Sequence, residues 1–217
     1  MILRRSLLSL LVAAGCTLAT SGARADDGGL RTGFELGGRV GYGFASGTIA
    51  NQVTFDDVGT SKFFLMLDLG YRITPSLYVG VLGEFGALHQ KESFRRVCRE
   101  VSTDCGLSNL RLGVNVQVHL PSLSFTLARS PFVPWIGAGL AYEELFASQG
   151  ASARFRGGAL SMMLGLDVLV SQGLHAGPMA ELSFGRYSTV DADDDRSITD
   201  HGVHQWLMLG VRAAYTF

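Results

Sequence analysis

Strict alternation of apolar and polar side chains marks several stretches of this chain, most clearly residues 109–120, which read NLRLGVNVQVHL. Each even position is apolar, and each odd position is polar or glycine. A period of two residues predicts an extended strand with two unlike faces. In a soluble sandwich the apolar face would form the core. In a membrane barrel it would face lipid and the polar face would point inward.

The same alternation recurs along the chain and assigns eight strands, with apolar side chains outward and small or polar side chains inward. The expected strands cover about 33–45, 62–73, 77–88, 109–120, 132–145, 159–170, 174–185 and 204–217. Pro134 and Pro178 fall inside two of them. Proline removes a ladder hydrogen bond, so we expect bulges or strand ends at both positions.

Short and long connections alternate between the expected strands. Residues 74–76 and 171–173 form tight turns, whereas 121–131 is longer than usual for its class. Outer-membrane barrels have short periplasmic turns and long extracellular loops. This pattern predicts four extracellular loops, at about 46–61, 89–107, 146–157 and 186–203.

Aromatic side chains gather at the two ends of the expected strands. One set lies at the outer ends: Tyr42, Phe44, Phe63, Phe85, Tyr142 and Phe184. A second set lies at the periplasmic ends: Phe34, Tyr71, Phe132, Tyr215 and Phe217. Two aromatic girdles are typical of a membrane barrel, so the apolar faces are expected to face lipid.

The first 25 residues are expected to be a signal peptide. Arg4 and Arg5 form a basic start, an uncharged and mostly apolar run follows, and Ala23-Arg24-Ala25 fits the small-x-small cleavage rule. The mature chain, 26–217, is then one barrel domain. Residues 13–16, Ala-Ala-Gly-Cys, also resemble a lipobox, so acylation of Cys16 remains an alternative.

The C-terminal residues alternate to the very end and finish on an aromatic side chain. This run resembles the C-terminal signature of bacterial outer-membrane barrels, with Tyr215 and Phe217 as the assembly signal that the barrel assembly machinery reads. The whole mature chain resembles the small barrels of the OmpA transmembrane-domain and OmpX type. The resemblance implies an all-β fold, an eight-stranded antiparallel up-and-down transmembrane β-barrel in the bacterial outer membrane.

Composition agrees with this architecture. The chain is 47% hydrophobic, carries 17% charged residues and contains 28 glycines. Tight strands and turns use glycine, and a barrel spreads its apolar residues over half-apolar strands. The net charge of −1 argues against nucleic acid as a partner. We expect no cofactor.

Charged side chains of both signs are expected inside the barrel, where isolated charges would carry a large desolvation cost. Strand order and height pair Glu35 with Arg212, Arg39 with Asp68, and Glu84 with Arg111. The expected network comprises Glu35, Arg39, Asp68, Arg72, Glu84, Arg111, Glu143, Asp167, Glu181 and Arg212, with Lys62 also inward. Such a network predicts a salt-bridged plug, with an ion pathway as the alternative.

Two loops carry further candidate chemistry. Cys98 and Cys105 are expected to form a disulfide in an exported protein, and free thiols or a thiolate metal site with His89 are the alternatives. The run DADDD offers Asp191, Asp193 and Asp195 to a divalent cation, but its spacing departs from an EF-hand, so a solvated acidic loop is the simpler interpretation.

The expected function is structural or surface-interacting, without catalysis. Barrel enzymes that modify lipid A use His and Ser, whereas His119 and His175 are expected to point inward here. Basic side chains of loop 89–107 suit lipopolysaccharide phosphates, and the loops suit an unidentified extracellular partner. A lipid A-modifying enzyme and a narrow channel remain the alternatives.

Overall fold

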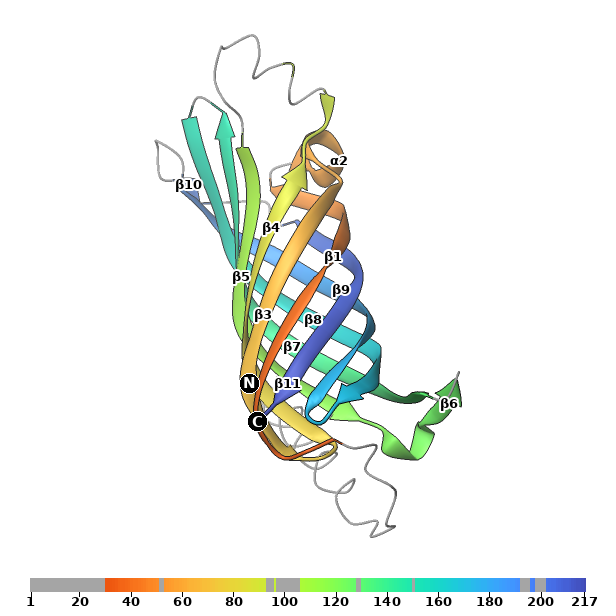
Figure 1. Cartoon of the computed structure of the whole chain (residues 1–217). Helices are drawn as coiled ribbons and strands as arrows, with labels where there is room; N and C mark the ends of the chain where they lie inside the picture. Colours follow the sequence, from red (N-terminus) through yellow and green to blue (C-terminus); the bar gives the residue numbers. More distant parts are fainter. Residues whose placement is uncertain are drawn as a thin grey trace, which may run out of the picture.

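Eight long antiparallel strands close into a tall barrel (Figure 1). The computed structural model describes residues 30–50, 53–92, 96, 106–127, 130–149, 151–191, 196–197 and 202–217. The barrel strands are β1 (Gly33–Ala50), β3 (Ser61–Thr74), β4 (Leu77–His89), β5 (Gly106–His119), β7 (Ser130–Gln149), β8 (Ala151–Ser171), β9 (Leu174–Asp191) and β11 (Val203–Thr216). Each pairs with its neighbour along the chain, and β11 pairs with β1 from Glu35↔Thr216 to Gly47↔His204. The eight-stranded up-and-down barrel is therefore confirmed.

Short strands and helical turns lie at the two ends of the barrel. At the end with the long loops lie β2 (Val53–Thr54), α2 (Phe55–Val58) and β10 (Arg196–Ser197). At the opposite end lie the 3-10 turn η1 (Pro121–Leu123) and β6 (Phe125–Leu127), which leaves the barrel sideways (Figure 1). Among the described residues, no helix is long and apolar enough to cross a membrane.

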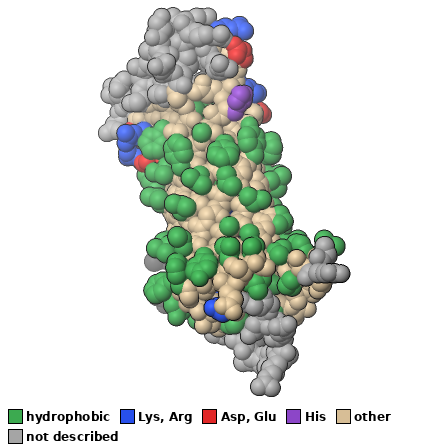
Figure 2. Space-filling view, in the orientation of Figure 1, with side chains coloured by type: hydrophobic (Ala, Val, Ile, Leu, Met, Phe, Trp, Pro, Cys, Tyr) green, Lys and Arg blue, Asp and Glu red, His purple; other side chains and the backbone are tan. Residues whose placement is uncertain are grey.

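The outer wall is apolar, as the alternation predicts. In Figure 2, hydrophobic side chains cover the visible wall, and charged side chains lie toward its two ends. Side chains such as Leu67, Phe85 and Leu164 are more than half exposed, whereas the residues on either side of each are buried. Exposure of large apolar groups on every strand is stable only against lipid, because water would penalise it.

Strands extend further into the expected loops than the sequence indicated. The segment 146–157 is not a loop, because β7 runs to Gln149 and β8 starts at Ala151, with pairs such as Ala147↔Ala153. Likewise β9 continues to Asp191, and β1 continues to Ala50. Backbone pairing continues beyond the alternating stretch because a hairpin ladder needs no apolar period, so the side-chain pattern underestimates the length of the strands.

The two prolines lie where neighbouring ladders stop, and neither causes a register shift. Pro134 pairs in register with Leu166 and lies just beyond the last β5–β7 pair, His119↔Trp135. Pro178 pairs with Val211, and the β8–β9 ladder is interrupted beside it. Both strands continue through their prolines, so the expectation of bulges or strand ends was wrong. The missing N–H groups cost few hydrogen bonds, because each proline lies beside a gap in one neighbouring ladder.

The short helix α2 lies over the interior at the end of the barrel that carries the long connections (Figure 1). Thr54 donates its amide and hydroxyl to the Asp57 carboxylate (2.9 and 2.6 Å), and these bonds lower the pKa of Asp57. The short helix aims Phe55 into the barrel, where it is fully buried against Trp206 and His204. Phe55 therefore covers the interior with an apolar ring at this end of the barrel.

Candidate functional site in the barrel interior

Every charged side chain expected inside the barrel is buried. All ten residues of the expected network, and also Lys62, are at most 2% exposed. They project from alternate positions of the eight strands, so the pleat of each strand directs them inward. They divide into a middle layer, an outer layer and a layer at the end with the short turns, which is the periplasmic end in barrels of this kind.

The middle layer begins with a forked ion pair between neighbouring strands. Arg39 Nε lies 2.8 Å from Asp68 Oδ2, and Arg39 Nη2 lies 2.7 Å from Asp68 Oδ1. Asn115 donates to the same Oδ1 at 2.7 Å. Two parallel N–H···O bonds fix the guanidinium as well as neutralise it. Arg39 Nη1 also reaches toward Glu181 Oε2 at 3.7 Å, which links this pair to the far wall.

Arg111 joins two carboxylates on different walls. Its Nη1 donates to Glu84 Oε2 at 2.7 Å, and its Nη2 donates to Glu181 Oε1 at 2.9 Å. Lys62 binds the other oxygen of Glu84 and donates to Asn109 Oδ1 at 2.8 Å. The interior is thus braced from β3 and β4 across to β9.

The outer layer centres on Glu143, which ion-pairs with no Lys or Arg among the described residues. Asn109 Nδ2 donates to Glu143 Oε1 at 2.8 Å, and the Tyr187 hydroxyl donates to the same oxygen at 3.1 Å. His204 Nε2 lies 3.2 Å from Glu143 Oε2, and the His204 ring stacks on Tyr187 at 4.4 Å. Phe55 packs on the His204 ring, with ring centroids 5.6 Å apart, and so covers this layer on the side of α2.

The periplasmic layer centres on Glu35. Arg212 Nη2 donates to Glu35 Oε1 at 2.6 Å, while Arg72 donates to Oε2 through Nε (2.8 Å) and Nη2 (2.5 Å). Thr216 adds a hydroxyl donor at 3.1 Å. With this layer, the structure brings together all three pairs that strand order suggested.

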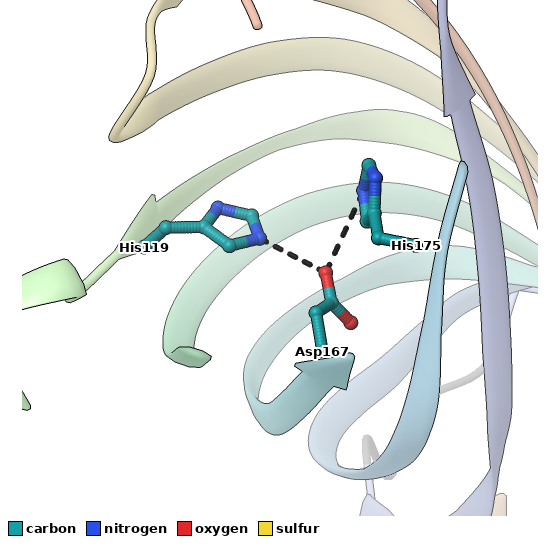
Figure 3. A group of neighbouring side chains, drawn as sticks. All are labelled: His119, Asp167 and His175. Carbon is teal, nitrogen blue, oxygen red and sulfur yellow. Dashed lines mark hydrogen bonds and ion pairs between the residues drawn. The ribbon is translucent and has the colours of Figure 1, made fainter. Parts of the chain in front are cut away.

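His119, Asp167 and His175 form a cluster whose ligand atoms lie within 4.8 Å of one another (Figure 3). Asp167 Oδ2 lies 3.0 Å from His119 Nε2 and 3.5 Å from His175 Nε2, and Arg212 also donates to it. Arg72 Nη1 lies 3.0 Å from His119 Nδ1. Arginine can only donate, so Nδ1 is the acceptor and the ring proton sits on Nε2, facing Asp167.

This arrangement does not fit a metal ion. Both nitrogens of His119 are already hydrogen-bonded, and two guanidiniums lie against the same cluster. A cation would have to displace these donors and sit beside two fixed positive charges. The cluster is instead a satisfied hydrogen-bond network, completed by Trp135 Nε1, which donates to Asp167 Oδ1 at 3.1 Å.

The other sequence-based sites lie at the edge of the described residues or outside them. Cys98, Cys105, Asp193 and Asp195 are outside the described residues, as is the expected signal peptide. Asp191 ends β9, and its carboxylate pairs with Arg156 Nη1 at 2.5 Å. Tyr215 and Phe217 lie on the outer wall, where their rings pack edge to face at 4.9 Å.

Sequence reasoning missed one pair of chemically reactive residue types on the outer wall. Ser61 and His89 are direct partners of the β3–β4 ladder and lie on its outward side at the end with the long connections, where His89 is exposed but Ser61 is buried. Ser61 Oγ is hydrogen-bonded to the Tyr42 hydroxyl at 2.9 Å. Both residues fall inside stretches that were expected to be loops, so the alternation could not place them on one face.

A closed barrel with an exposed apolar wall and a filled, charge-paired interior defines an integral protein of the bacterial outer membrane. The sequence matches the outer membrane protein beta-barrel domain over residues 8–217, so the chain belongs to that family.

Solved structures of outer-membrane barrels agree with the fold. Neisserial surface protein A shares 14% identity, with 85% of this chain and 97% of that one covered and a TM-score of 0.55. OprG of Pseudomonas aeruginosa shares 11% identity, with 87% and 99% covered and a TM-score of 0.50. At these identities the likeness concerns the fold alone. No curated protein matches the sequence.

Proposed function

We propose that this protein is a non-catalytic outer-membrane scaffold that presents its extracellular segments to a partner at the cell surface. The observation that carries this proposal is the set of buried layers of ion pairs and hydrogen bonds that fills the interior from Glu35 at one end to Glu143 at the other. Such cross-bracing makes the barrel a rigid support rather than a conduit.

The length of the outermost hairpin supports a role outside the membrane. β7 and β8 contain 20 and 21 residues, whereas a tilted strand needs only about 9–11 residues to cross a bilayer. The surplus of both strands lies beyond the outer aromatic girdle, where it can meet a partner at the cell surface. The barrel assembly machinery and the surrounding lipid are the other partners that this proposal implies.

A pull-down with intact cells and with purified lipopolysaccharide tests this role. A variant that lacks residues 147–153 shortens the hairpin while the paired wall below it stays intact. We expect the wild type to be pulled down and the hairpin variant to be pulled down less. A variant that lacks residues 193–195 serves as the matched loop control. Equal retention by the wild type and every loop variant would contradict a surface-contact role.

A narrow channel is the first alternative, and conductance decides it. In planar bilayers we expect no single-channel steps from the wild type, because Arg39, Arg111 and Phe55 occupy the interior at successive heights. Reproducible current steps from purified wild-type protein would contradict the scaffold proposal and establish a channel.

A lipid-modifying enzyme is the second alternative, and Ser61 beside His89 is the observation that favours it. Against it, Ser61 Oγ is bound to Tyr42, and no described carboxylate contacts His89 to orient its ring. Mass spectrometry of lipid A from cells that express the wild type or Ser61→Ala decides between them. A change in the acyl chains of lipid A that requires Ser61 would establish enzyme activity. Identical lipid A in both strains would exclude the enzyme alternative.

A further inference from the structure

A groove of about 590 Å³ opens on the lipid-facing wall near the extracellular end of the barrel. It spans β7, β8, β9 and the start of β11. Its outward apolar lining comes from Leu140, Tyr142, Leu160, Phe184 and Val203. The groove exists because Gly158 stands at its floor, where an added Cβ would meet one atom, at 3.9 Å.

One cation stands at the rim of this groove. Arg186 follows Phe184 on the same face of β9, about 7 Å further toward the extracellular end. Its side chain is exposed, and its cross-strand neighbours are Val203 and Gly158, which carry no charge. Among the described residues no carboxylate pairs with Arg186. Nearby Arg156, by contrast, is held by Glu144 at 2.7 Å and by Asp191 at 2.5 Å.

A second groove on the outer wall has a similar volume but no exposed arginine at its rim. It has about 610 Å³ and is lined by residues such as Gly38, Val40, Leu65 and Pro178. The arginines in its lining, Arg39 and Arg212, are buried and paired inside the barrel. That groove can offer only apolar contact, whereas the groove at Gly158 combines apolar contact with a guanidinium that no carboxylate of the described residues neutralises.

We propose that the groove at Gly158 binds a phosphorylated, acylated glycolipid of the outer leaflet. An acyl chain lies along Leu140, Leu160 and Phe184, and a phosphate accepts hydrogen bonds from Arg186. The height of the groove selects the outer leaflet, because Tyr142 and Phe184 belong to the outer aromatic girdle and Arg186 lies just beyond it. A guanidinium at that level meets phosphate in a geometry that permits two parallel hydrogen bonds. This inference does not rest on the proposed surface role.

Lipid retention measured by native mass spectrometry tests the site. The protein is reconstituted in phosphatidylcholine nanodiscs that contain bisphosphorylated lipid A, then released into detergent, and the lipid that remains bound is counted. We expect the wild type to retain lipid A, and Arg186→Gln to retain about tenfold less, since a charged hydrogen bond is lost. Gly158→Leu should lower retention similarly by filling the groove.

Matched variants separate the site from general effects. Arg154→Gln removes an exposed arginine from the same strand as Gly158 but outside the groove, and Gly38→Leu fills the second groove. Both should retain lipid A as the wild type does. Heat-modifiability confirms that each variant is folded, and Arg186→Gln alone carries the test if Gly158→Leu does not insert.

Three results would overturn the proposal. Equal losses in Arg186→Gln and Arg154→Gln would show diffuse charge attraction without a site. Equal retention of dephosphorylated lipid A would show that the phosphate is not recognised. Equal retention of phosphatidylglycerol in its place would show that the site does not distinguish the glycolipid of the outer leaflet.

Discussion

Arg111 and Glu181 meet across the barrel, with Nη2 of the arginine 2.9 Å from Oε1 of the glutamate. The two residues lie on β5 and β9, which share no ladder, because β7 and β8 stand between them on one side. A contact of this kind ties opposite walls together, and both side chains are buried.

Replacing Arg111 by leucine should destabilise the barrel. The change leaves Glu181 with only a 3.7 Å contact to Arg39, and it leaves Glu84 with Lys62 alone. Stranding a buried charge costs on the order of 3–5 kcal/mol. We expect the heat-modifiability midpoint of Arg111→Leu to fall clearly below that of the wild type.

Gln117→Leu is the matched control, since it also places leucine at an inward position of β5. Gln117 is fully buried, and neither polar atom of its side chain has a hydrogen-bond partner among the described residues. Removing an unsatisfied amide costs little or even stabilises. An unchanged midpoint for Arg111→Leu, or a loss as large in Gln117→Leu, would show that water fills the interior and replaces these partners.

Phe55→Ala should release α2 from the barrel mouth and leave the barrel itself folded. Phe55 packs on Trp206 with ring centroids 5.0 Å apart and is fully buried, and truncation of a buried phenylalanine costs roughly 3–5 kcal/mol. The loss should appear as faster hydrogen exchange and external proteolysis of residues 53–60. Asp56→Ala, on the exposed side of the same helix, should leave both rates unchanged.

Deleting Phe217 should impair insertion. The backbone amide of Phe217 donates to Phe34 at 2.9 Å, which is a small loss, so the expected defect lies in recognition by the assembly machinery rather than in barrel stability. We expect exported but protease-sensitive protein. The variant Phe217→Tyr keeps a terminal aromatic and should insert normally, whereas normal amounts of barrel from the deletion would refute the assembly signal.

Cys98 and Cys105 should form a disulfide in the exported protein. The closed loop is short, so the chain-entropy model gives a gain of roughly 2–3 kcal/mol, felt as local order in the loop. Mass spectrometry of alkylated, non-reduced protein should find no free thiol in the mature chain. Two alkylated cysteines would rule the disulfide out, and the double Cys→Ser variant should still insert, with faster cleavage of the loop.

The sequence by itself determined the strand count, the outward face and the pairs between neighbouring strands. Alternation fixes which side chains share a face, and short turns fix the height at which neighbours meet. Glu84 and Arg111 are therefore predictable, because they are direct partners of the β4–β5 ladder.

Only the tertiary structure decided which charges meet across the interior. Arg111 with Glu181, or His119 with Asp167, lie on strands that are not neighbours, so their contact depends on how the barrel closes and on the tilt of its strands. The same holds for the groove at Gly158 and for Ser61 beside His89. Their residues lie far apart in the chain or in expected loops, where no periodic signal reports which side chains share a surface.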